Sequence, residues 1–245
     1  MSTARAALLA AALIAGSVPA TAGPPYVTDD PVPTDRGHWE IYNFVNGAKA
    51  TGVLGGEAGI DLNYGAADSL QLTVVLPVAY EHDLRTRAGA GTVELAAKYR
   101  LVHAGDAAAP VDIAIFPRVY LASAGDGLGS GRTQLLLPVW IGRDFDDWSA
   151  FGGGGYQFNP GNGARDFWMA GVALTRTLSA RLAIGAELYG RTAVEVGGRS
   201  LVAASVGVTL SLRPHWSLLA SAGPGLAHAR TEGEYAYYLS LKAEY

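Results

Sequence analysis

The stretch GEYAYYLSLKAEY, residues 233–245, decides the fold. Apolar residues occupy every second position from Tyr235 to Tyr245, and most positions between them, such as Ser240 and Lys242, are polar. A period of two predicts a β-strand with one apolar face and one polar face.

The same alternation recurs along the chain, for example in VELAAKYRL at 93–101 and RLAIGAELYGR at 181–191. The pattern predicts strands near 37–47, 55–65, 68–81, 91–102, 110–122, 132–143, 148–158, 166–177, 181–193, 199–212, 215–226 and 233–245. Each is close to the length of about 9–11 residues that a tilted membrane strand needs. Longer Gly-rich connections alternate with short ones, as in outer-membrane barrels. We therefore expect an all-β fold, a closed antiparallel transmembrane barrel of about 12 strands over residues 37–245.

The chain ends on an aromatic residue, Tyr245. This ending resembles the C-terminal recognition signal of bacterial outer-membrane barrels, so Tyr245 is our candidate membrane-assembly signal. A soluble β-sandwich with an aromatic core is the alternative. The terminal aromatic residue and the alternation of loop lengths favour the membrane barrel.

Residues 1–22 read as a secretory signal peptide. Arg5 supplies the positive region, residues 6–16 an apolar run, and Ala20-Thr21-Ala22 a small-residue cleavage pattern. A membrane anchor is the alternative, but the apolar run is shorter than the ~20 residues of a spanning helix. We expect cleavage after Ala22 and a location in the outer membrane of a Gram-negative bacterium. The expected partners are outer-membrane lipid, the barrel-assembly machinery and a small-molecule solute.

The composition excludes several classes of function. The chain of 245 residues has a formal net charge of −4, and no basic cluster predicts a nucleic-acid partner. It has no cysteine, which rules out thiol chemistry and cysteine-based metal sites. We predict no cofactor and no metal site, because a set such as His38, Glu40, Asp29 and Asp30 has no spacing that requires one.

Charged residues on the predicted strands must face the lumen, since a charge facing lipid at the bilayer midplane costs ~2–4 kcal/mol. The lumen and constriction candidates are Glu94, Lys98, Arg100, Asp112, Arg118, Glu187 and Arg191. They suit either a charged constriction that selects solutes or a salt-bridged filling that keeps the barrel shut. The sequence leaves these two interpretations open.

Two local features interrupt the pattern. Pro77, Pro117 and Pro138 fall inside predicted strands, where we expect bulges rather than broken strands. The run FGGGGYQF at 151–158 lacks the Lys-Ser/Thr of a phosphate loop. It predicts a close approach of other backbone, and the N-terminal segment is one candidate.

An outer-membrane hydrolase is a distant alternative. It would need a Ser–His pair oriented by a third polar group, and none of the five histidines lies in a nucleophile motif. We therefore predict no catalytic residue and no enzyme activity.

The stretch GPPYVTDDPVPTDRGHWEIY, residues 23–42, resembles the start of a family of outer-membrane proteins named for a meta-pathway of phenol degradation and often called transporters. Thr28-Asp29-Asp30-Pro31 and Gly37-His38-Trp39-Glu40 carry the resemblance, and residues 93–101 and 115–127 are similar to family segments. The resemblance implies passage of small, hydrophobic or aromatic compounds across the outer membrane. It implies no catalytic residue.

Residues 23–36 are rich in proline and acidic residues and precede the first strand. An extended segment of this kind loses little entropy on docking. We expect it to fold into the lumen as a plug, with Asp29, Asp30 and Asp35 facing Lys98, Arg100, Arg118 or Arg191. A disordered periplasmic tail is the alternative.

Overall fold

A computed structural model describes residues 25–106, 109–125 and 127–245 of the chain. The predicted signal peptide, residues 1–22, lies outside the described residues. The strands are β1 Trp39–Ala50, β2 Val53–Ala67, β3 Leu70–His82, β4 Thr86–Ala90, β5 Glu94–Val102, β6 Asp112–Ile115, β7 Arg118–Tyr120, β8 Gln134–Phe145, β9 Trp148–Phe158, β10 Phe167–Ser179, β11 Leu182–Arg191, β12 Leu201–Arg213, β13 Trp216–Ala227 and β14 Tyr235–Glu244, with one short helix, α1 Ala229–Glu232. Among these residues no helix is long and apolar enough to cross a membrane.

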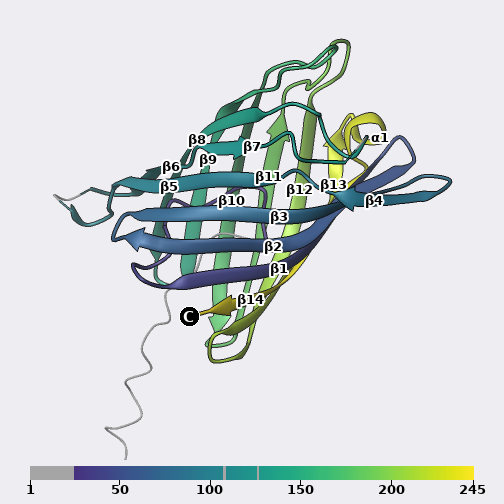
Figure 1. The fold of residues 1–245 in the computed structure, drawn as a ribbon. Coiled ribbons are helices and arrows are strands. Elements are labelled where there is room, and N and C mark those ends of the chain that lie inside the picture. Colours follow the sequence, from purple (N-terminus) through teal and green to yellow (C-terminus); the bar gives the residue numbers. More distant parts are fainter. Residues whose placement is uncertain (1–24, 107–108, 126) are drawn as a thin grey trace, which may run out of the picture.

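These strands form one closed antiparallel barrel of 12 strands, as predicted (Figure 1). Two of the 12 are each broken into two pieces. β4 and β5 pair with successive parts of β3, and β6 and β7 both lie between β5 and β8. The barrel closes where β1 pairs with β14, and Trp39 and Tyr245 exchange two backbone hydrogen bonds of 2.8 and 3.0 Å at the end of this seam.

The bulges expected at Pro77, Pro117 and Pro138 are corrected, because each proline instead lies in or opposite one of the two strand breaks. Pro117 separates β6 from β7, while β3 and β8 run through Pro77 and Pro138 without a register shift toward β2 and β9. Pro77 and Pro138 instead face the broken strands, and their carbonyls accept from the N–H groups of Gly91 and Phe116. A proline has no N–H to donate on that side, so the ladder is interrupted in the neighbouring strand.

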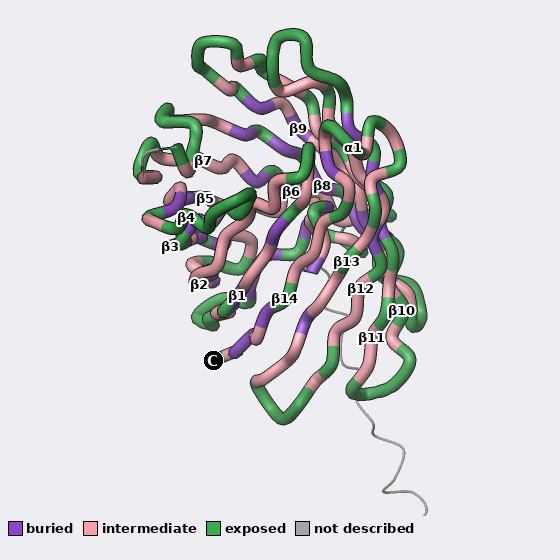
Figure 2. Tube along the Cα trace, turned by 90° about the vertical axis from the view of Figure 1, so that its right-hand side faces the viewer, coloured by how far each residue is buried: buried purple, intermediate pink, exposed green. Residues whose placement is uncertain are grey.

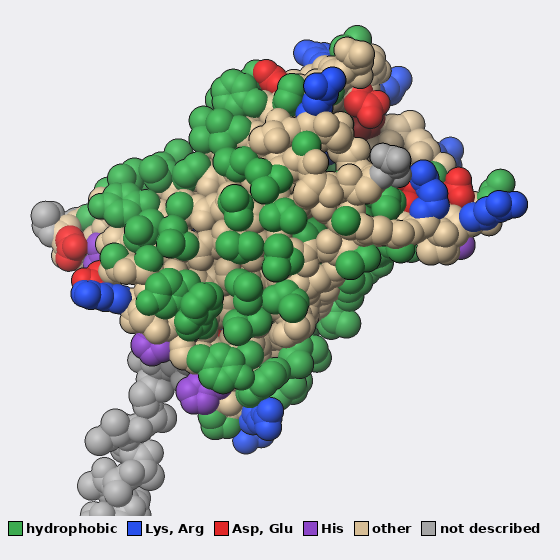
Figure 3. Space-filling view, in the orientation of Figure 1, with side chains coloured by type: hydrophobic (Ala, Val, Ile, Leu, Met, Phe, Trp, Pro, Cys, Tyr) green, Lys and Arg blue, Asp and Glu red, His purple; other side chains and the backbone are tan. Residues whose placement is uncertain are grey.

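Alternation along the strands separates the two faces of the wall. In β8, Leu136 and Trp140 are buried inside the barrel, whereas Val139 and Ile141 are 42% and 44% exposed on the outside. Figure 2 shows the buried positions along the wall and the exposed ones at its two ends. Hydrophobic side chains form a broad belt on the outer surface, and charged side chains gather beyond its edges (Figure 3). This is the surface of a barrel that lies in lipid.

The two ends of the barrel differ in their connections. At one end, here called the turn end, four connections contain only two residues, at 68–69, 146–147, 180–181 and 214–215, and a fifth covers 103–111. This end also holds the C-terminus. The other end, the loop end, carries the longer connections 121–133, 159–166, 192–200 and 228–234.

Two segments that the sequence predicts as connections are mostly strand. One lies between the predicted strands 37–47 and 55–65, and the other between 68–81 and 91–102. β1 and β2 meet at a tight turn, because Thr51 and Gly52 both have positive φ angles, of 51° and 85°. Such a pair makes the two-residue turn that suits a twisted hairpin. Likewise, β3 and β4 extend the wall into the predicted loop at 82–91.

Candidate functional site

The barrel contains a cavity of about 1480 Å³. Its lining includes His38 and Tyr245 from the turn end and Leu128 and Glu232 from the loop end. The cavity therefore follows the length of the lumen. It lies beside an N-terminal segment, residues 25–36, which we call the strap.

The strap crosses the lumen from one wall to the opposite one. At its start, Ser221 of β13 donates to the carbonyl of Pro25, and the N–H groups of Val27 and Thr28 donate to the Glu187 carboxylate of β11 at 3.1 and 3.0 Å. At its end, Thr34 donates its N–H to Gln71 of β3 at 2.8 Å. The strap is therefore held at both walls.

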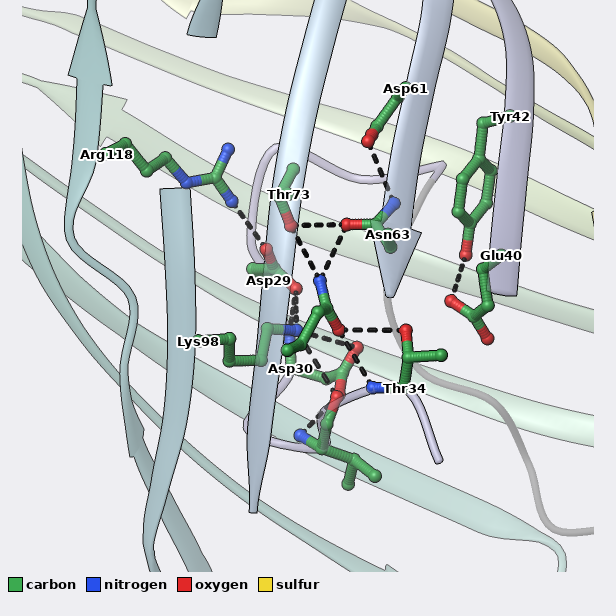
Figure 4. Close-up of polar contacts among 12 residues, drawn as sticks. Asp29, Asp30, Thr34, Glu40, Tyr42, Asp61, Asn63, Thr73, Lys98 and Arg118 are labelled. Carbon is green, nitrogen blue, oxygen red and sulfur yellow. Dashed lines mark hydrogen bonds and ion pairs between the residues drawn. The ribbon is translucent and has the colours of Figure 1, made fainter. Parts of the chain in front are cut away.

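In the middle of the strap, Asp29 joins two cations, the buried Lys98 and the partly buried Arg118 (Figure 4). Its carboxylate lies 2.9 Å from Lys98 Nζ and 2.6 Å from an Arg118 nitrogen. Glu94 is 3.4 Å from Arg118, and Asp30 is 3.9 Å from Lys98. Lys98 is only 4% exposed, so these charges depend on one another for compensation.

The carboxyls of Asp29 and Asp30 have pKa values shifted in opposite directions. Burial acts to raise the pKa of Asp29, but the nearby cations Lys98 and Arg118 outweigh burial and hold that pKa below its usual range. Burial raises the pKa of Asp30, and Lys98 offsets this only in part. Asp29 is therefore the carboxylate that carries the ion pairs.

A polar network holds the end of the strap. Gln71 accepts from the Thr34 N–H and donates to Asn63 at 2.7 Å, and Asn63 donates to Asp61 at 2.8 Å (Figure 4). Thr73 completes the network. A search for charged residues misses Gln71, Asn63 and Thr73, although their inward alternation on β2 and β3 is visible in the sequence.

The remaining predicted residues lie apart from the strap. Arg100 pairs with Asp112 at 3.5 Å near the turn end, and Arg191 pairs with Glu232 of α1 at 3.4 Å near the loop end. Asp35 is exposed, and no ion pair of its carboxylate is among the described contacts. Of the four cations considered for the strap, Lys98 and Arg118 contact it, whereas Arg100 and Arg191 pair elsewhere.

Glycines of the inner wall make room for the strap. A Cβ on Gly207 would lie 2.7 Å from the Tyr26 ring, and one on Gly142 would lie 2.8 Å from Pro31. Gly171 and Gly185 lie just as close to Thr28 and Tyr26. The run Gly152–Gly155 is crowded by its neighbouring strands and by Trp140. The strap approaches the stretch 151–158 at Phe151, whose ring centre lies 6.3 Å from that of Tyr26, in line with the expectation for this stretch.

A substitution at Gly207 tests this fit. We expect Gly207→Val to push Tyr26 out and to raise ion conductance, because all three atoms nearest to the new Cβ belong to Tyr26. Gly55→Val is the matched control, since Gly55 lines the cavity and its Cβ would meet only a Tyr80 backbone oxygen at 3.9 Å. Equal conductance of the two variants in a planar bilayer would contradict the fit.

Three of the histidines make local polar contacts at the two ends of the barrel. His82 contacts Thr86, His228 contacts a backbone carbonyl, and His103 lies 3.6 Å from Asp112. Within the described ranges no group of three or more His, Asp and Glu side chains is arranged to hold a metal ion.

Comparison with solved structures places the fold among outer-membrane barrels. The COG4313 outer membrane channel from Pseudomonas putida F1 superposes with a TM-score of 0.72 and 14% identity, covering 88% of this chain and 98% of that one. The NanC porin gives a TM-score of 0.59 and 7% identity, with coverage of 84% and 98%. The β domain of the Bordetella autotransporter BrkA gives 0.51 and 16%, also with 84% and 98%.

No protein-family model and no curated protein matches the chain. At these identities the likeness concerns the fold alone: the chain folds as a 12-strand outer-membrane β-barrel.

Proposed function

We propose that the protein is an outer-membrane channel for small solutes, and that its strap narrows the lumen. The observation that carries this proposal is the cavity of about 1480 Å³, lined by residues from both ends of the barrel. Two of the similar structures are described as a channel and a porin, which supports the proposal. Short turns lie on the periplasmic side of such barrels, which puts the turn end in the periplasm.

The residues that line the cavity suggest the kind of solute. They include twelve carboxylate side chains but only three cationic ones, Lys98, Arg118 and Arg191. Aromatic rings, among them Tyr42, Tyr120 and Tyr238, also face the cavity. We propose small solutes that are cationic or that carry an aromatic ring. A role in passage of phenol-derived compounds, which the family resemblance implies, belongs to the same proposal.

A barrel with a filled lumen is the second candidate. The strap and its buried ion pairs favour it, because they occupy the middle of the lumen. Single-channel recording in a planar bilayer separates the two candidates. Conductance by the intact protein supports a channel, and silence with and without the strap supports a filled barrel.

We expect the channel to prefer cations, because Glu57 and Asp61 line the cavity and neither pairs with a cation in the described residues. Under a potassium chloride gradient, the reversal potential should show potassium passing more easily than chloride. Glu57→Gln with Asp61→Asn should reduce this preference.

Asp106→Asn with Glu195→Gln is the control, because it removes the same charge from exposed positions outside the cavity lining. A reversal potential near zero in the unmodified protein, or an equal change in both double variants, would contradict the predicted cation preference.

A further inference from the structure

Four arginines lie along the turn end between β8 and β13. They are Arg143 in β8, Arg176 in β10, Arg181 in the turn after β10 and Arg213 at the end of β12. All four are exposed. We call them the arginine row.

The strand registers put Arg143, Arg176 and Arg213 on the outer surface, and Arg181 lies in the adjoining turn. Arg143 is level with Ala150 and Leu174, and Arg213 lies opposite Trp216. Residues that pair directly across a sheet share a face, and Leu174 is one of the exposed hydrophobic residues of the outer belt. The arginine row therefore borders the lipid-facing surface, outside the lumen.

Two tryptophans beside the arginine row indicate its depth in the membrane. The guanidinium of Arg176 lies 5.1 Å from the ring centre of Trp148, the first residue of β9. Arg213 lies 5.0 Å from Trp216, the first residue of β13. Tryptophan is enriched at the level of lipid headgroups, so the arginines reach the phosphates beside it.

In the described ranges the arginine row forms no ion pair with a carboxylate. None of its members is within 4.0 Å of a carboxylate in the described ranges, although Asp144, Asp146 and Asp147 occupy the same end. The lumen cations Lys98, Arg118 and Lys242 are all paired. Guanidinium groups suit phosphate because they can donate two parallel hydrogen bonds.

We propose that the arginine row binds the phosphodiester groups of anionic phospholipids in the periplasmic leaflet of the outer membrane. This binding site rests on the proposed membrane location of the barrel, but it does not depend on whether the barrel conducts. The remaining arginines of the described chain without an ion pair, such as Arg132 and Arg165, lie in connections at the loop end.

Native mass spectrometry of the refolded full chain tests the proposal, with phosphatidylglycerol added in detergent. The row variant is R143Q/R176Q/R181Q/R213Q, and R132Q/R165Q/R199Q/R230Q is the control with equal charge loss at the loop end. We expect affinity for phosphatidylglycerol to fall about fivefold for each arginine of the row removed. The control should bind like the unmodified protein.

Three results would overturn the proposal: retained binding by the row variant, equal loss in the control, or stabilisation of the barrel by inorganic phosphate as strong as that by the lipid. If the row variant fails to refold, R143Q/R176Q and R181Q/R213Q should each weaken binding about 25-fold. Failure of the unmodified protein to insert into phosphatidylglycerol vesicles would refute the membrane location itself. Insertion without specific lipid binding would refute only the proposed lipid site.

Discussion

Deleting the strap, residues 25–36, is expected to raise single-channel conductance severalfold over that of the intact protein. The strap crosses the lumen between β13 and β3, so its removal joins the space on its two sides. The barrel should stay closed, because β1 and β14 pair from Glu40 to Lys49 without help from the strap. Lys98 and Arg118 lose Asp29, but water entering the enlarged lumen can solvate them.

The recording needs a check that the shortened protein still forms a barrel. A barrel that stays folded in an unheated sample changes its electrophoretic mobility when the sample is heated. Both the intact and the shortened protein should show this change in mobility. Unchanged conductance of a folded deletion variant would mean that solutes pass beside the strap unhindered. In that case the strap braces the wall and does not narrow the channel.

Alternation of apolar and polar residues was sufficient to predict the barrel and its strand number. The alternation shows which residues face the lumen and which face lipid. The barrel then closes when each strand pairs with the strands next to it in the sequence. The alternation could not predict where the strands end. The segment at 48–50 reads as part of a connection because Ala and Lys are poor strand formers, yet its pairing with β2 and β14 keeps it in the wall.

The contacts of the strap were harder to predict than the fold. Charge alone pointed to three strap carboxyls, Asp29, Asp30 and Asp35, and to four possible cations. Which of them meet depends on the position of each residue along the barrel axis in the closed wall. Glu187 accepts hydrogen bonds from backbone N–H groups of the strap. Because no complementary side chain is involved, the sequence does not show that Glu187 holds the strap. The glycine positions near Tyr26 come from β11 and β12, and only the three-dimensional register brings them under one side chain.

The second large effect concerns Asp29, the charged centre of the strap. Asp29→Asn should release the strap, because it removes the closest partner of two cations, one of them fully buried. Breaking a buried ion pair costs about 3–5 kcal/mol. We expect the lower part of this range, since Lys98 keeps Asp30 and Arg118 keeps Glu94.

A single cysteine can report this release directly, because the chain has none of its own. Thr28 suits the purpose: its side chain is fully buried, and its hydroxyl has no hydrogen-bond partner among the described residues. In a Thr28→Cys background, Asp29→Asn should speed reaction with a thiol reagent about 100-fold, as a loss of roughly 3 kcal/mol predicts. The rate in denaturant corrects for any direct effect of residue 29 on the thiol.

Asp35→Asn is the matched control, because it removes the same charge from the same segment at an exposed position. It should leave the labelling rate unchanged. If both variants label at the same rate, the ion pairs of Asp29 do not hold the strap. The anchoring would then rest on Glu187, Gln71 and the glycines of the wall, which bind the strap through its backbone and its shape.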